Sequence, residues 1–211
     1  MFCAIIPFSL IRKVLSIMPA LTMEKAKALI AAHVTEPHLL THALAVSAAM
    51  GAMAEHFGAD RAHWEAIGYL HDVDYEEFPE EHLQHTQTML ANEATADTAI
   101  DESDVRAILS HGYGLCSDVE PLTDMEKSLF TVDELTGIVQ AASLMRPTGI
   151  SDLEVSSLKK KFKDKKFAAK CDREVIKKGC DMLGMELDAV MALVIQGMRA
   201  HMAELGIGPK A

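Results

Sequence analysis

Residues 68–75 read Gly-Tyr-Leu-His-Asp-Val-Asp-Tyr, and this stretch does most to decide how the chain folds. It ends an apolar helical pattern and places His71 beside Asp72, where a chain leaving a helix can aim two adjacent side chains at one ion. Adjacent histidine and aspartate also occur by chance, so the pair alone is a weak signal. The pair gains weight from four further candidate ligands along the chain: His42, His82, His111 and Asp133.

The surroundings of these residues favour a metal site built from several helices. Asp133 lies between Val132 and Leu135, and a buried carboxylate needs a cation or hydrogen-bond partners. His111 ends a helical pattern. His42 alone would be an ordinary boundary residue, but imidazoles and carboxylates together suit divalent transition metals. The remaining histidines lack such a setting, and we expect them to be solvated or boundary residues: His33, His38, His56, His63 and His201.

The hydrophobic period is helical almost throughout, which predicts an all-α protein. Thr22 and Asp60 are expected N-caps, and Gly58 is an expected helix stop. Small residues from Leu40 to Gly51 predict close helix packing. We expect helices over residues 22–33, 36–57, 61–70, 81–93, 102–110, 124–145, 172–183 and 186–204, with an acidic loop at 73–80.

These elements predict one helical bundle with an additional C-terminal helical segment. Residues 22–150 would form the metal-binding core, residues 151–205 a basic segment and helices packed on it, and residues 206–211 a tail. Residues 1–21 form an apolar extension, which we interpret first as a start codon assigned too early. A surface anchor and a targeting leader are the alternatives.

Composition limits the function classes. The 211 residues fit one domain, and the formal net charge of −11 argues against a nucleic-acid polymer as partner. A small anionic substrate fits, because a metal supplies local positive charge. No segment is long and apolar enough to span a membrane. The four cysteines form no CxxC pair, which predicts reduced thiols in a cytoplasmic protein. An oligomer is compatible with the sequence.

On these residues the chain resembles the HD-domain superfamily of metal-dependent phosphohydrolases, over about residues 22–205. His42, His71, Asp72 and Asp133 match its four-ligand mononuclear pattern. The full set, with His82 and His111, resembles the dinuclear variants, which include cyclic-dinucleotide phosphodiesterases and di-iron oxygenases related to myo-inositol oxygenase. The resemblance implies one or two divalent ions of iron, manganese, zinc, nickel or cobalt. His85 is the alternative to His82, one turn further along the expected helix.

The resemblance also implies hydrolysis of a nucleotide or another small phosphate ester by a metal-activated water. Asp72 is the expected bridging residue, and proton transfer is expected from Asp74 or Glu76, with Glu134 as the alternative. Asp74 replaces the glycine of the common pattern, and its other interpretation is a surface charge. A di-iron oxygenase and a non-catalytic ligand-sensing module are the competing functions. The residues expected to clamp substrate phosphates, unless they form only a solvated face, are Lys160, Lys161 and Lys165.

Overall fold

The computed structural model describes residues 21–93 and 100–210, and the regular structure in these ranges is helical. No strand occurs in them, which confirms the all-α prediction; nearly all of the apolar extension lies outside the described residues. The helices are α2 (Met23–Ile30), α3 (Pro37–Phe57), α4 (Arg61–Leu70), α5 (Thr86–Asn92), α6 (Glu102–Ser110), α7 (Asp124–Leu144), α8 (Val155–Lys163), α9 (Arg173–Leu183) and α10 (Leu187–Ala200), with a short 3-10 helix η1 (Pro79–Glu81).

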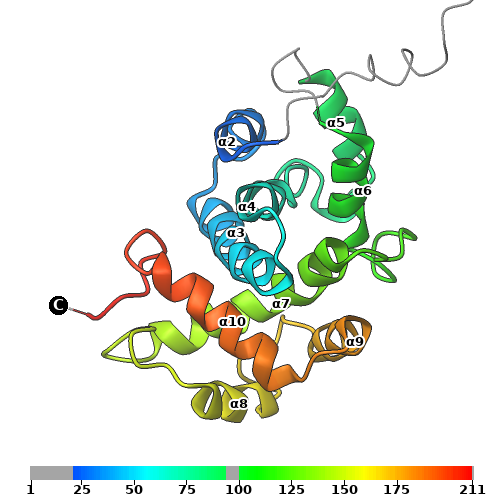
Figure 1. Ribbon diagram of the computed structural model, residues 1–211. Coiled ribbons are helices and arrows are strands. Elements are labelled where there is room, and N and C mark those ends of the chain that lie inside the picture. Colours follow the sequence, from blue (N-terminus) through cyan, green and yellow to red (C-terminus); the bar gives the residue numbers. More distant parts are fainter. Residues whose placement is uncertain (1–20, 94–99, 211) are drawn as a thin grey trace, which may run out of the picture.

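The two long helices α3 and α7 lie at the centre of the bundle (Figure 1). Helix α3 packs against α4, α7 and α10, while α7 also contacts α6, α8 and α9. Helices α8, α9 and α10 lie together at the end of the molecule away from α2 and α5 (Figure 1). The C-terminal helices thus cover the same two central helices that carry His42 and Asp133.

Small residues allow α3 to approach its neighbours closely, as the stripe between Leu40 and Gly51 predicts. A Cβ atom on Gly68 of α4 would lie 3.0 Å from the Cα atom of Ser47. A Cβ atom on Gly197 of α10 would lie 2.2 Å from the carbonyl oxygen of Ala48. Real Cβ atoms do not approach a backbone to 2.2 Å, so the α3–α10 crossing requires glycine, while a Cβ atom at position 68 would force α3 and α4 to move apart by a few tenths of an ångström. The α3–α4 crossing brings the end of α4, and His71 with it, beside α3.

The expected helix over 81–93 begins at the wrong residue, because α5 starts only at Thr86. Leu83 adopts the left-handed conformation with φ 69°, which a continuous α-helix excludes. Its N–H donates to the buried Asp74 carboxylate at 2.7 Å. Hydrophobic periodicity cannot reveal this bond, so it placed the helix start five residues too early. The expected helix 186–204 likewise ends early, at Ala200.

Two expectations from composition are confirmed for the described residues. No helix in these ranges is both long and apolar enough to cross a bilayer. Cys116, Cys171 and Cys180 are free thiols; Cys3 lies outside the described residues.

Candidate metal centre

The six predicted ligands converge from separate parts of the bundle. His42 projects from the second turn of α3, and Asp133 projects from the middle of α7. His71 and His111 are the C-cap residues of α4 and α6, where a side chain can turn away from its helix face. The candidate ligand atoms of His42, His71 and Asp133 lie within 4.8 Å of one another, as do those of His71, Asp72 and His111.

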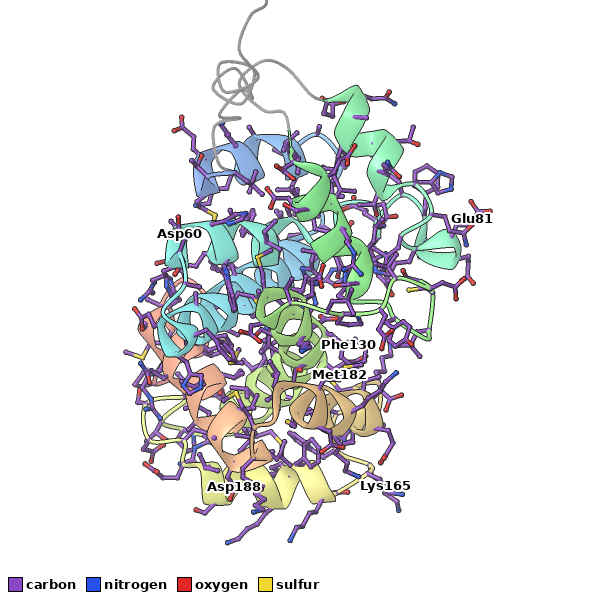
Figure 2. All side chains as sticks on the ribbon, turned by 45° about the vertical axis from the view of Figure 1, so that its right-hand side comes forward. Asp60, Glu81, Phe130, Lys165, Met182 and Asp188 are labelled. Atoms are coloured by element: carbon purple, nitrogen blue, oxygen red, sulfur yellow. The ribbon has the colours of Figure 1, made fainter. Side chains whose placement is uncertain are left out.

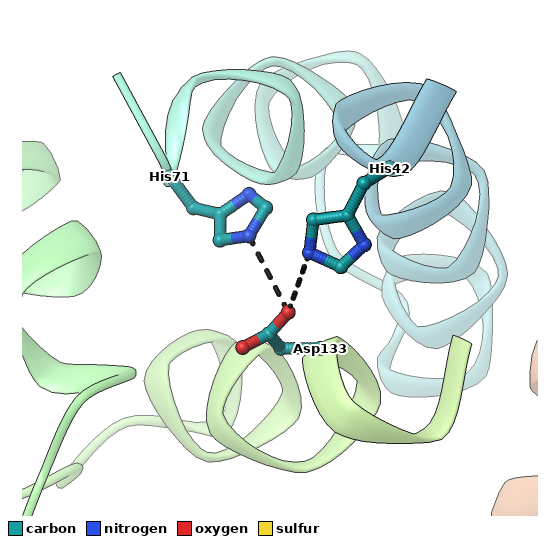
Figure 3. Close-up of side chains that lie close together, drawn as sticks. All are labelled: His42, His71 and Asp133. Atoms are coloured by element: carbon teal, nitrogen blue, oxygen red, sulfur yellow. Dashed lines mark ion pairs between the residues drawn. The ribbon is translucent and has the colours of Figure 1, made fainter. Parts of the chain in front are cut away.

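His42, His71 and Asp133 meet around one carboxylate oxygen (Figure 3). The Asp133 Oδ1 atom lies 2.9 Å from His42 Nε2 and 3.4 Å from His71 Nε2. The Asp72 Oδ2 atom faces the same two nitrogens, at 3.6 Å from His42 and 3.3 Å from His71. Two imidazoles and two carboxylates therefore enclose one position, which we call the first half-site.

The other Asp72 oxygen faces a second pair of imidazoles. Asp72 Oδ1 lies 3.3 Å from His82 Nε2 and 3.4 Å from His111 Nε2. These two nitrogens lie 3.1 Å apart. We call His82, His111 and Asp72 Oδ1 the second half-site. Asp72 thus offers one oxygen to each half-site.

Hydrogen bonds at Nδ1 fix the orientation of three histidines. His71 Nδ1 lies 2.8 Å from the Gly68 carbonyl, and His111 Nδ1 lies 2.7 Å from the Ile108 carbonyl. His82 Nδ1 lies 2.8 Å from the Asp74 carboxylate. Carbonyl and carboxylate oxygens only accept hydrogen bonds, so each Nδ1 carries the proton and donates. In the neutral tautomer, each Nε2 then directs a lone pair into the cluster.

Lone pairs aimed at carboxylates and at each other repel unless a cation lies between them. His71 Nε2 is buried and has no hydrogen-bond partner among the described residues. Metal-bound histidines usually donate their other N–H to a carbonyl or carboxylate, as these three do. The donor set therefore fits a metal ion, and the cluster can hold one.

Without a metal, protons must supply the missing positive charge. Burial lowers the pKa of His82, but Asp72 and Asp74 outweigh it and raise that pKa to about 9. Burial opposes the charged form of His71 as well, yet Asp72 and Asp133 raise its pKa well above the usual value. Burial also raises the pKa of Asp72, whereas the neighbouring imidazoles hold it well below its usual range. The buried carboxylates of the cluster thus favour positive charge on the groups beside them.

A cavity of about 450 Å³ opens onto both half-sites. Glu134 lines it without joining the cluster, and its carboxylate accepts a hydrogen bond from the Asp172 N–H at 2.9 Å. Burial, and then the nearby Asp133 charge, raises the pKa of Glu134 to about 7. His38, expected to be solvated, lines the rim with a side chain that is 75% exposed.

The structure separates His82 from His85. His82 lies in the cluster, while the His85 Nε2 atom lies 2.6 Å from Glu81 and its ring stacks on Phe78 at 3.9 Å. The two residues precede α5, so the one-turn spacing assumed from the sequence does not place them on one helix face. His82 is therefore the histidine that faces His111.

The acidic residues after Asp72 lie outside the cluster. Asp74 is fully buried, which contradicts its interpretation as a surface charge. Its carboxylate bonds His82 Nδ1, the ring nitrogen that does not face the cluster. Glu76 accepts hydrogen bonds from the Thr35 N–H and hydroxyl, both at 2.8 Å, and from the Glu36 N–H at 3.0 Å. Of the three residues weighed for proton transfer, Glu134 is the one that lines the cavity.

None of the lysines expected to clamp phosphate lines the metal cavity. The Lys161 Nζ atom lies over the Phe167 ring, 4.8 Å from its centroid. Lys160 is exposed on α8, and Lys165 stands at the outer edge of the molecule near α8 (Figure 2). Lys170 does line the cavity. The basic composition of 159–170 signalled a positive segment but not which of its lysines faces the ligands.

Comparison with known proteins agrees with this geometry. A family model described as HD domain matches residues 39–136. The matched range contains all six clustered residues, from His42 to Asp133. No curated protein and no solved structure matches the chain. Residues 39–136 therefore carry an HD domain, the kind of domain that characterises the HD superfamily of metal-dependent hydrolases.

Proposed function

We propose that the chain is a metal-dependent phosphohydrolase that acts on a nucleotide or another small phosphate ester. The observation that carries this proposal is the position of Asp72, whose two oxygens each face a separate set of imidazole Nε2 atoms. Such a donor set could hold one or two divalent ions, and iron, manganese, zinc, nickel and cobalt all suit its nitrogen and oxygen donors.

A bound divalent ion would generate a nucleophilic hydroxide from water near neutral pH and offset charge that develops at phosphorus. The chain's own residues prepare the site. His71, His82 and His111 are held by their Nδ1–H bonds, so their Nε2 atoms need no reorientation when a ligand enters. Fixed donors of this kind reduce the reorganisation that accompanies reaction.

Asp74 and Glu76 take supporting roles in this proposal. Asp74 holds the His82 ring through Nδ1 and also accepts the Leu83 N–H, so it positions a ligand instead of touching substrate. Glu76 fastens the start of α3 through Thr35 and Glu36. Glu134 is the cavity-lining carboxylate outside the ligand set, and we assign it the transfer of a proton to or from the reacting groups.

The rest of the chain supports this site. We propose that residues 22–150 form the metal-binding core, while residues 151–205 cover α3 and α7. The expected partner is a small anionic molecule, because the formal net charge of −11 argues against a nucleic-acid polymer.

A di-iron oxygenase is the second candidate, because its dinuclear ligand set would also occupy both half-sites. His82 and His111 are the specific observation in its favour, since a mononuclear hydrolase does not need them. Oxygen dependence separates the two activities.

The experiment is a phosphate-release screen over nucleotides and phosphorylated metabolites, with protein reconstituted with each candidate metal in the absence of oxygen. The proposal predicts metal-dependent phosphate release that Asp72→Asn abolishes. Turnover that requires oxygen and releases no phosphate would replace the proposal with the oxygenase. Full in-cell function of Asp72→Asn would instead favour the ligand-sensing module.

A further inference from the structure

A second cavity, of about 530 Å³, shares a wall with the metal cavity. Lys170 and Cys171 line both. Each cavity alone has the size of a small-molecule site, about 300–1,000 Å³. Lys170 is exposed, so a molecule longer than one phosphate ester can extend from the metal centre across its side chain into the second cavity.

The lining of the second cavity carries a surplus of positive charge. Lys163, Lys165 and Lys170 line it, and none forms an ion pair with another residue that the structure describes. Lys177 is different, because its Nζ atom pairs with Glu174 at 2.7 Å. Asp172, the other acidic lining residue, is engaged as the N-cap of α9. Three free lysines therefore concentrate beside the metal cavity of a chain whose formal net charge is −11.

A different extension of the metal cavity lacks this character. A cavity of about 490 Å³ meets the metal cavity at Leu115 and Val175. Its charged lining comprises three acidic residues and two lysines: Asp172, Glu174, Asp181, Lys177 and Lys178. Charge therefore favours the lysine-lined cavity as the one that receives an anionic part of a ligand.

The loop that carries Lys165 and Lys170 is held in place by α9 and α7. The Arg173 guanidinium donates to the carbonyls of Ala168 and Cys171, each at 2.6 Å. The Asp172 N–H fastens the end of the loop to Glu134. Ala168 has φ 43°, a conformation that non-glycine residues rarely adopt without such constraints. A loop fixed in this way presents its lysines with less entropy lost on binding.

We propose that Lys163, Lys165 and Lys170 form a second anion subsite, and that the substrate carries another phosphate group beyond the one bound at the metal centre. Lysine binds phosphate as a compact point charge, and three of them suit a doubly charged group. Lys165 stands at the outer edge of the molecule, so the additional phosphate would bind at the outer end of the substrate (Figure 2). This inference rests on the proposed phosphohydrolase function and names the class of its substrate.

Calorimetric binding of two probes, inorganic tripolyphosphate and orthophosphate, tests the subsite in the metal-loaded and metal-stripped protein. Lys165→Ala and Lys170→Ala should each raise the Kd for tripolyphosphate about three- to fivefold, the upper part of the range for one exposed ionic contact. Lys165→Ala should leave the Kd for orthophosphate within about twofold, because that ion binds at the metal centre. In the metal-stripped protein, tripolyphosphate binding should weaken but keep its dependence on the lysines.

Lys166→Ala is the matched control, because it removes one positive charge from the same loop at a residue that lines neither cavity. It should leave tripolyphosphate binding within about twofold of the unmodified chain. Equal losses of affinity in Lys165→Ala and Lys166→Ala would overturn the subsite, because they would show a general effect of charge. Unchanged tripolyphosphate binding in Lys165→Ala and Lys170→Ala would overturn it as well. Phosphate release with these results would leave the proposed function standing. Lysine-dependent tripolyphosphate binding without any phosphate release would support the subsite and reject the function.

Discussion

Replacing Asp74 by asparagine should weaken the second half-site and spare the first. Asp74 accepts from His82 Nδ1 at 2.8 Å through Oδ1 and from the Leu83 N–H at 2.7 Å through Oδ2. Asparagine has one oxygen and one NH2 group, so it can accept only one of these two bonds well. Either the His82 ring loses its orientation or the Leu83 turn loses its anchor.

The magnitude follows from the role of such supporting bonds. Loss of a carboxylate behind a metal-bound histidine typically costs 10- to 100-fold in metal affinity, which is about 1.4–2.7 kcal/mol. We expect Asp74→Asn to raise the Kd of the ion at the second half-site by this factor. The ion at His42, His71 and Asp133 should be retained with its affinity changed by less than about threefold.

Metal titration with a competing chelator measures both affinities, and a thermal melt of each variant shows that it is folded. Glu76→Gln is the control. It also removes one negative charge, two residues further along the chain, but the Glu76 carboxylate bonds Thr35 and not a histidine of the cluster. Wild-type affinity for two ions in Asp74→Asn would refute the positioning role. An equal loss in Glu76→Gln would attribute the effect to overall charge.

Three further predictions address catalysis and stability. Glu134→Gln should lower kcat about 100-fold or more while metal content stays unchanged, because the variant cannot transfer a proton; steady-state kinetics with metal analysis checks this. Glu126→Ala should reduce the free energy of unfolding by about 2–4 kcal/mol in urea denaturation, because it removes the buried partner of Arg106 and of two backbone N–H groups before α7. Asp104 raises the pKa of His63 through a 2.8 Å bond, so this stabilisation is complete below about pH 6.5 and disappears as the pH rises through the raised value. His63→Gln should therefore cost about 1 kcal/mol at pH 5.5 and less at pH 9, measured by denaturation at both values.

The residues of the cluster could be predicted from the sequence because several of them have a local signature, although His42 alone has none. His71 and Asp72 stand next to each other at the end of an apolar helix, and Asp133 interrupts an apolar stretch on α7. A buried charge in such a place needs a partner, and the chain supplied several imidazoles in series. The close packing of helix α3 could likewise be predicted from its small residues, and its end could be predicted from Gly58.

The supporting residues could not be predicted, because their roles depend on contacts between distant parts of the chain. The left-handed turn at Leu83 depends on Asp74, nine residues earlier, and it separates His82 from His85. Lys170 faces the metal cavity because Arg173 fixes the carbonyls of the preceding loop. Neither contact leaves a hydrophobic period or a compositional bias in the sequence from which it could be predicted.

The proposed metal centre depends on one carboxylate, Asp72, whose two oxygens join the two half-sites. Quantitative metal analysis of chains purified with excess metal and then desalted tests it most directly, with the unmodified protein compared with Asp72→Ala and Glu76→Gln. We expect up to two ions per chain in the unmodified protein and in Glu76→Gln, and almost none in Asp72→Ala. Metal content in Asp72→Ala equal to that of the unmodified protein would contradict this expectation.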